Sequence, residues 1–138
     1  MIRPRLIPVI LIENGYAVKT INFKEPKYIG EPINIVRIFN DKQADEIVVL
    51  DIGCTKKNTQ INFDLIEKLS NETKMPLCYG GGIKNIEEAY KIFSYGVEKI
   101  SLSTLFFENI LEVKKLIDIF GSQSIAVTID INKNQEEL

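Results

Sequence analysis

Hydrophobic positions along the chain fall into two alternating patterns. Short runs that are apolar almost throughout predict buried strands at 5–12, 45–52, 76–79, 97–103 and 124–130. Between them, apolar residues recur at helical spacing and predict helices at 32–40, 63–70, 85–93 and 109–120. Strands without polar alternation are typical of a parallel sheet that is covered on both faces. The chain is therefore expected to be an α/β protein, either a doubly wound sheet or part of a (β/α)8 barrel.

The remaining segments predict turns and loops. Residues 13–15, Glu-Asn-Gly, are a turn signal, and 16–23 is predicted to be a second extended stretch within a long βα loop. Residues 24–31 contain Pro26 and Gly30 and predict a mobile loop. Gly121 ends the last helix, and a polar tail follows the last strand.

A run of three glycines, Gly80, Gly81 and Gly82, lies between the central strand and the helix that follows it. Glycine permits positive φ and close approach of the backbone to a ligand. A turn of this kind also directs free N–H groups at the start of a helix toward an anion. The run matches neither G-x-G-x-x-G nor G-x-x-x-x-G-K-[ST]. A phosphate-binding loop and a plain tight βα turn therefore both remain open.

A faint internal repeat favours the barrel over the doubly wound sheet. Residues 5–14 and 124–132 align with each other, and they belong to the first and fifth predicted strands. Look-alike strands four units apart are expected in a barrel made of two half-barrel repeats. In this register Leu11 occupies the position of Asp130.

Composition and charge narrow the possible functions. The chain has 138 residues, is 45% hydrophobic and 26% charged, and carries a formal net charge of −2, so we expect a globular domain with no nucleic-acid footprint. No apolar run approaches the ~20 residues that span a bilayer, and no signal-peptide pattern is seen, so a cytoplasmic location without a membrane partner is expected.

Candidate metal-ligating and nucleophilic residues are few. The chain contains no histidine, and Cys54 and Cys78 are not part of a C-x-x-C motif. We therefore expect two free thiols, no metal site, no cofactor and no Cys/His or Ser/His/Asp nucleophile.

Taken together, the motifs resemble the cyclase subunit of imidazole glycerol phosphate synthase, a (β/α)8 barrel that receives ammonia from a glutaminase partner. The resemblance covers essentially the whole chain. It rests on Ile7-Pro8, Gly15, Val18-Lys19, Asn22-Phe23, Asp45-Glu46, Leu50-Asp51-Ile52, Gly80–Ile83, Lys99, Ser101, Thr104, Phe120–Gln123 and Ile129-Asp130. A paralogous branch, associated with amidation of surface-polysaccharide sugars, is more similar still in Arg3–Arg5, Val18–Thr20 and Pro76–Gly82.

The resemblance implies an ammonia gate formed by Arg5, Glu46 and Lys99. Alternate residues of a strand face one side, so these three side chains should point into the barrel from the starts of three strands. The same parity points Ile7, Val9, Leu11, Val48, Cys78, Ser101, Ser103, Ala126, Thr128 and Asp130 inward. The alternative for the three charged residues is a salt-bridge cluster that closes the bottom of the barrel.

At the opposite end, the resemblance implies a substrate site. Gly80, Gly81 and Gly82, with Thr104 and with Ser103 in place of the family's asparagine, match a phosphate site; the alternative for Ser103 and Thr104 is a helix N-cap. Lys19 matches a loop residue that contacts substrate, unless it is simply a solvated loop lysine. Asp130 matches one of two catalytic aspartates, and its alternative role is a cap at a strand end.

Two departures from the family pattern change the expected activity. The second catalytic aspartate is replaced by Leu11, which cannot transfer a proton, and Glu13 could face the mouth only if the strand bends. The family barrel runs to about 250 residues, so residues 1–138 are expected to form a single incomplete, truncated barrel domain with about five βα units.

These observations leave three expected functions. The first is a synthase-side subunit that takes ammonia from a class I glutaminase for amidation of a phosphorylated or nucleotide-linked sugar. The second is the histidine-pathway cyclase, and the third is a non-catalytic half-barrel or split-gene product. Open strand edges and an uncovered apolar interior also predict that the isolated chain forms a homodimer of half-barrels or a soluble aggregate.

Overall fold

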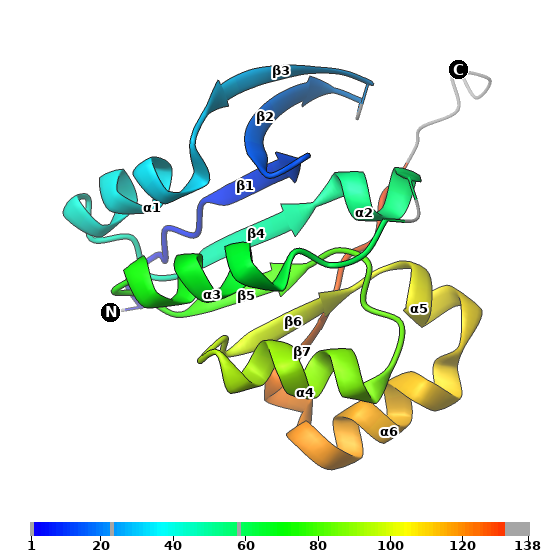
Figure 1. Cartoon of the computed structure of the whole chain (residues 1–138). Coiled ribbons are helices and arrows are strands. Elements are labelled where there is room, and N and C mark those ends of the chain that lie inside the picture. Colours follow the sequence, from blue (N-terminus) through cyan, green and yellow to red (C-terminus); the bar gives the residue numbers. More distant parts are fainter. Residues whose placement is uncertain (1, 23, 58, 132–138) are drawn as a thin grey trace, which may run out of the picture.

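The structure is a computed structural model that describes residues 2–22, 24–57 and 59–131. Its strands form a single sheet in the order β3-β2-β1-β4-β5-β6-β7 (Figure 1). The strand bounds are β1 Val9–Glu13, β2 Tyr16–Ile21, β3 Lys24–Gly30, β4 Ile47–Asp51, β5 Leu77–Gly80, β6 Lys99–Leu102 and β7 Ile125–Val127. β2 pairs antiparallel with both β1 and β3. The other five strands, in the order β1-β4-β5-β6-β7, pair in parallel with their neighbours.

The parallel strands form part of a (β/α)8 barrel, as the sequence predicts. Each strand of this run pairs in parallel with the next, and a crossover that contains at least one helix joins consecutive strands. Within the described residues β7 pairs with β6 alone, so the sheet remains open. The fold is thus an incomplete barrel wall of five βα-type strands, with β2 and β3 added at one edge.

The helices lie along one face of the curved sheet (Figure 1). They are α1 Pro32–Asp41, α2 Ile52–Lys57, α3 Phe63–Glu72, α4 Ile86–Ser94, α5 Thr104–Glu108 and α6 Ile110–Phe120, with a 3₁₀ turn, η1, at Ser122–Ser124. Asparagine caps fix the starts of three of them: the Oδ1 atoms of Asn62, Asn85 and Asn109 accept hydrogen bonds from backbone amides three residues on. Among the described residues, no helix has both the length and the apolar character needed to cross a bilayer.

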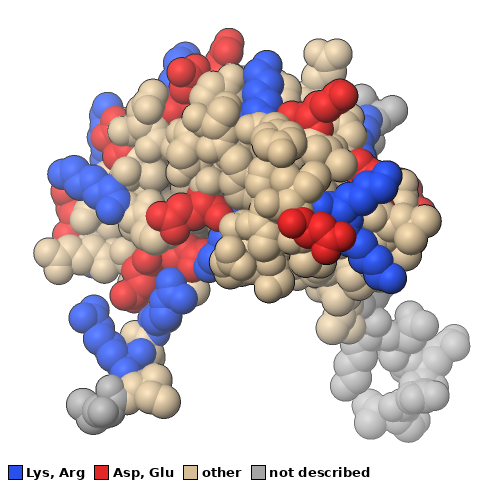
Figure 2. All heavy atoms as spheres, turned by 90° about the horizontal axis from the view of Figure 1, so that it is seen from below, with Lys and Arg blue, Asp and Glu red and all other residues tan. Residues whose placement is uncertain are grey.

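The core lies between the helices and the outer face of the sheet. Ile12, Ile47 and Ile100 are at most 1% exposed and pack in this layer. The opposite face has the predicted inward parity: Val9 on β1 is 56% exposed, whereas its neighbour Ile10 is buried. Seen from below, basic and acidic side chains are interspersed over the surface without a large patch of one sign (Figure 2). In the described part of the chain the helices cover the outer face alone, so the inner face is left uncovered, as expected for an incomplete barrel.

The prediction of a mobile loop at 24–31 is wrong, because Lys24–Gly30 form β3 and Glu31 is the N-cap of α1. This strand pairs antiparallel with β2, with Val18 opposite Tyr28 and Lys19 opposite Lys27. Pro26 is tolerated because β3 is an edge strand, where a missing backbone donor leaves no ladder bond unmade. The sheet therefore has seven strands where five were expected.

Other differences concern the lengths of elements. The first strand begins at Val9, although Leu6 already runs beside β4: its amide donates to Asp45 Oδ2 at 2.7 Å, and its carbonyl accepts from Asp45 N at 2.9 Å. The last strand covers only Ile125–Val127. The short helices α2 and α5 were not predicted. The polar tail, from 132 onward, and Phe23 lie outside the described residues.

Candidate functional site

A pocket of about 740 Å³ opens at the carboxyl ends of the parallel strands. It lies where β4, β5 and β6 end and where the chain continues beyond β7. Its lining includes the predicted site residues Gly80, Gly81, Gly82, Ser103, Thr104 and Asp130. The structure therefore brings together residues that lie at the ends of three strands, β5, β6 and β7.

Close packing explains why the turn after β5 is made of glycines. Gly81 has φ of 129°, and a Cβ atom there would lie 2.5 Å from the carbonyl oxygen of Asp51. Gly82 has φ of 72°, and a Cβ atom there would lie 2.9 Å from the Cβ of Cys54. The tight-turn interpretation of the sequence is thus satisfied, and the same turn also lines the pocket.

The start of α4 is already capped. Asn85 Oδ1 accepts from the Glu88 amide at 2.9 Å, and Glu88 Oε2 accepts from the Lys84 amide at 2.7 Å. Asn85 thus caps the Glu88 amide of the helix, and Glu88 in turn holds the amide of Lys84, the residue before the cap. An anion in the pocket would therefore rely on the glycine turn itself and on the neighbouring Ser103-Thr104 segment.

Ser103 occupies the N-cap position of α5, but its side chain makes no capping hydrogen bond. Ser103 is half-buried and Thr104 is exposed, and both line the pocket. A hydroxyl group that does not cap its own helix is available to a ligand. The structure thus shows no side-chain capping by Ser103, and its role in ligand binding stays a prediction.

The other residues predicted near the pocket mouth differ in whether they line the pocket. Asp130 is exposed and lines the pocket. Lys19 is exposed on β2 and is not among the lining residues. Leu11 is half-buried and pairs with Leu50, and neither Leu11 nor Glu13 lines the pocket. Glu13 is 9% exposed, with its Cγ only 3.3 Å from the position of a Cβ on Gly53.

Asp51 is a pocket residue that sequence reasoning did not select. It ends β4, is 7% exposed, and its Oδ1 accepts from the amides of Gly53 at 3.0 Å and Cys54 at 3.1 Å. An aspartate between a buried strand and a following glycine is an N-cap signal that could have revealed α2.

The two cysteines are free and buried. Burial raises the pKa of the Cys54 thiol to about 11, and the nearby Asp51 carboxylate adds to the shift. Burial likewise raises the pKa of Cys78 to about 11. Because the thiolate is the nucleophile, neither group is activated for covalent chemistry near neutral pH. In the described part of the chain, no cluster of three or more His, Cys, Asp or Glu side chains could hold a metal ion.

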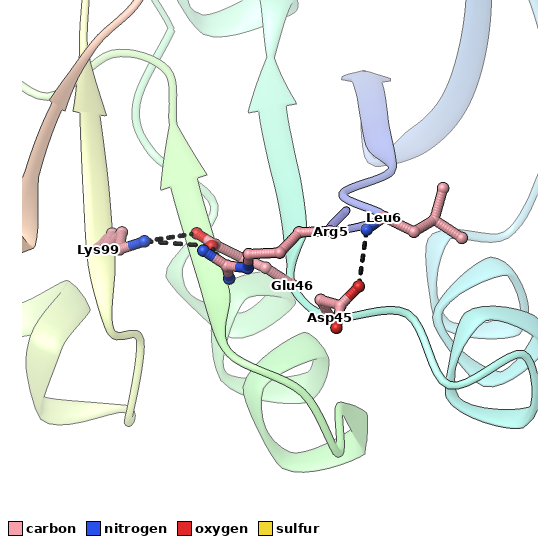
Figure 3. A network of polar contacts seen from close by, with 5 residues as sticks. All are labelled: Arg5, Leu6, Asp45, Glu46 and Lys99. Carbon is pink, nitrogen blue, oxygen red and sulfur yellow. Dashed lines mark hydrogen bonds and ion pairs between the residues drawn. The ribbon is translucent and has the colours of Figure 1, made fainter. Parts of the chain in front are cut away.

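A cluster of ion pairs lies at the opposite ends of the strands (Figure 3). Glu46, 5% exposed in its side chain, accepts from Arg5 Nη2 at 3.0 Å and from Lys99 Nζ at 3.0 and 3.1 Å. The side chains come from the segment before β1, from the start of β4 and from the start of β6. The structure thus brings the three predicted gate residues into direct contact.

Small polar side chains lie between this cluster and the pocket. Lys99 and Ser101 both face inward from β6, as the parity argument predicts. The hydroxyl groups of Ser101 and Thr128 are hydrogen-bonded to each other, which joins β6 to the residue that follows β7. Ser101 and Thr128 also line the pocket.

A curved parallel α/β wall with its pocket at the carboxyl ends of the strands is the arrangement of (β/α)8-barrel proteins. The particular family follows from the sequence. Residues 5–137 match the family described as "Histidine biosynthesis protein", and the chain belongs to that family.

Individual relatives carry more specific names. The chain is 53% identical over 133 residues to a protein of Leptospira borgpetersenii that is provisionally named imidazole glycerol phosphate synthase subunit HisF. It is 48% identical to a provisionally named subunit, hisF2, of Pseudomonas aeruginosa, and 38% identical over 137 residues to the imidazole glycerol phosphate synthase subunit HisF of Clostridium botulinum (strain Langeland). These alignments cover 96%, 96% and 99% of this chain but 52%, 53% and 54% of the relatives. The chain therefore spans about half the length of the curated relatives it matches.

Proposed function

We propose that this chain contributes the amino-terminal part of a synthase-side subunit that uses ammonia from a glutaminase partner to amidate a phosphorylated or nucleotide-linked sugar. The ion-pair cluster of Arg5, Glu46 and Lys99 is the observation that carries the proposal. It lies at the ends of the strands opposite to the pocket, so a reactant that enters there would travel through the barrel interior before it reached the substrate.

The charges of this cluster suit a gate for ammonia. Two cations face one carboxylate, so the cluster carries an excess of one positive charge (+2 − 1 = +1). That excess repels ammonium but does not oppose neutral ammonia, which is the nucleophilic form. The partly exposed Lys99, at 35%, and Arg5, at 55%, can move more easily than the buried carboxylate between them. The two cations are therefore the moving parts of the proposed gate, and Glu46 is its fixed part.

The pocket would hold the acceptor. The glycine turn and Thr104 supply backbone and hydroxyl groups for a phosphate, and Asp130 supplies an exposed carboxylate at the same mouth. Lys19 lies on the neighbouring hairpin and would approach the substrate only if that hairpin moved over the mouth.

Amidation suits this pocket better than ring closure. Ring closure in the family requires an acid–base pair, and the second position of that pair is Leu11. Glu13 does not replace it, because Glu13 is buried beside Gly53 and away from the pocket lining. When ammonia attacks a sugar carbon that already carries a leaving group, the new C–N bond replaces the bond to that group, and only the proton released from the attacking nitrogen has to be removed.

The second candidate function is the cyclase step of imidazole glycerol phosphate synthesis. The names of the relatives favour it, and so does Asp130, which lines the pocket. The word "subunit" in those names is consistent with a separate glutaminase chain as the partner.

A labelling experiment separates the two candidates. The complete protein that carries this chain is mixed with a class I glutaminase subunit and glutamine labelled with ¹⁵N in the side-chain amide. One reaction contains an activated nucleotide-linked sugar and the other the family's ribosyl-formimino phosphate substrate. We expect ¹⁵N in the sugar, detected by mass spectrometry, and no imidazole product. Label in an imidazole product instead would establish the cyclase, and label in neither would overturn both.

A further inference from the structure

Asp51 connects two segments that line the pocket. It is the last residue of β4, and its Oδ1 accepts hydrogen bonds from the amides of Gly53 and Cys54 at 3.0 and 3.1 Å. These bonds satisfy two of the orphan donors at the start of α2, which has only six residues. The beginning of α2 is therefore held in place by this one carboxylate.

The backbone of the same residue supports the glycine turn. A Cβ on Gly81 would lie 2.5 Å from the carbonyl oxygen of Asp51 and 2.8 Å from its Cβ, so the turn crosses directly over Asp51. The Cys54 side chain, at the start of α2, meets Gly82 in the same way, with its Cβ 2.9 Å from the corresponding position. One aspartate thus touches Gly81 directly and reaches Gly82 through the segment that it caps.

A hydrogen bond from the strand before it also holds the turn. The Tyr79 hydroxyl donates to the carbonyl of Gly81 at 3.3 Å. Gly81 is therefore held by the Tyr79 hydroxyl through its carbonyl and packs closely against Asp51. The conformation of the turn then depends on the position of Asp51, because glycine has no side chain with which to anchor itself.

We propose that Asp51 is a positioning residue, which holds the turn Gly80–Gly82 in the geometry that binds phosphate. This inference rests on the phosphate site of the proposed function. Asp51 lines the pocket, but it acts through Gly81 and Cys54 and not as a proton donor, because its Oδ1 already accepts two amide hydrogens. The oxygen acceptor at this position holds the turn in place. The negative charge of the same carboxylate disfavours an anion bound nearby.

This distinction between acceptor and charge predicts opposite behaviour for two substitutions. Asp51→Asn keeps an oxygen that can cap α2 and removes the charge, so the turn keeps its structure and phosphate binds at least as tightly as in the wild type. Asp51→Ala removes the acceptor, so the start of α2 and the glycine turn both loosen. We expect phosphate affinity to fall about tenfold in Asp51→Ala, the size of effect that a lost cap produces.

The experiment uses the full chain with inorganic phosphate as the probe and has two arms. The first arm, without phosphate, measures amide hydrogen exchange at Gly81 and Gly82. The second follows the same amides by NMR during a phosphate titration. Asn40→Ala is the matched control, because Asn40 Oδ1 accepts from the Lys74 amide at 2.9 Å, away from the residues that line the pocket.

Faster exchange at Gly81 and Gly82 in Asp51→Ala, but not in Asp51→Asn or Asn40→Ala, supports the positioning role. Unchanged exchange at the turn, or an equal increase throughout the chain, overturns it. If Asp51→Ala does not fold, Asp51→Glu, which displaces the acceptor by one methylene, takes its place: faster exchange at Gly81 and Gly82 supports the inference, and unchanged exchange overturns it. If the wild type binds no phosphate, the second arm refutes the phosphate site, while the exchange arm still decides the role of Asp51.

Discussion

The carbonyl oxygen of Asp51 lies 2.5 Å from where a Cβ atom on Gly81 would be. Real side chains do not approach a backbone oxygen so closely, so Gly81→Ala must move either β4 or the turn. The φ of 129° adds strain of its own. We expect a loss of about 2–3 kcal/mol in the free energy of unfolding, measured by urea denaturation.

Gly15→Ala provides the control for this prediction. Gly15 also has a positive φ, 81°, but a Cβ atom there would meet nothing within 4 Å. Its substitution should therefore cost only the strain of the backbone conformation, about 1 kcal/mol. Equal losses in the two variants would show that the contact with Asp51 contributes nothing.

Glu46→Gln should destabilise the fold and impair ammonia transfer together. The substitution leaves Arg5 and Lys99 next to each other with no carboxylate between them. Breaking a buried pair costs about 3–5 kcal/mol, and the exposure of both cations reduces this to about 1–2 kcal/mol. Urea denaturation measures the loss of stability, and glutamine-dependent turnover measures the transfer.

The exposed Arg37–Glu72 pair, whose atoms lie 2.9 Å apart, is the comparison for the ion cluster. It joins α1 to α3 on the outer surface, away from the gate residues. Glu72→Gln should leave transfer unchanged and lower stability much less than Glu46→Gln. If Glu46→Gln transfers ammonia at the wild-type rate, the cluster is structural only.

Thiol ionisation should make the protein less stable at alkaline pH. Burial raises the pKa of Cys54 and of Cys78 from 9.0 to about 11 in the folded chain. The unfolded thiols therefore release their protons first as the pH rises. The stabilisation that the neutral buried thiols provide is fully present below pH 9 and is lost as the pH rises toward about 11.

Thermal unfolding between pH 8 and 11 tests this expectation. A Cys54→Ala/Cys78→Ala variant should show a shallower decline over that window than the wild type. Thiol-reactive probes should also label the folded wild type slowly at pH 7.5 and quickly after denaturation. Rapid labelling of the folded chain would show that the thiols are not buried.

Residues 1–138 in isolation are expected to self-associate. Val9 and Ile7 on the inner face are 56% and 39% exposed, and each large apolar side chain gains about 1.5–3 kcal/mol on burial. Size-exclusion chromatography with light scattering should show a dimer or larger species. A monodisperse 15.7 kDa species with a cooperative thermal transition would contradict this prediction.

Val9→Lys tests whether the inner face causes the association. Val9 lies on the open face, where a charge would oppose contact between two such faces. Leu111 on α6, 66% exposed, provides the matched control at Leu111→Lys. Only Val9→Lys should shift the population toward monomer, whereas an equal shift in both variants would point to a different surface.

The sequence was most informative where local chemistry decides the structure. Asn62, Asn85 and Asn109 are good N-caps followed by helical periodicity, and the helices begin directly after them. The parity of β1 and β6 was also predictable, because one-residue alternation decides which side chains face inward. That alternation is enough to place Arg5, Glu46 and Lys99 on the same side of the sheet.

Features that depend on partners distant in sequence were not predictable. β3 is a strand because β2 offers it a free edge, and the composition around Pro26 gives no sign of that pairing. Asp51 was overlooked because its role comes from contacts with Gly81 and Cys54, which belong to different elements. The placement of Lys19 on β2, outside the pocket lining, depends on the same hairpin.

The ion pair between Glu46 and Lys99 also depends on how strongly the sheet bends. Glu46 directly precedes β4 and Lys99 begins β6, and β5 lies between these two strands. In Figure 3 the Glu46 side chain extends across the start of β5 to meet Lys99. Side chains two strands apart converge on the concave side of a bent sheet and diverge when the sheet flattens. A single carboxylate thus helps to set the radius at which the wall bends, and so the width of the space that further strands would have to close.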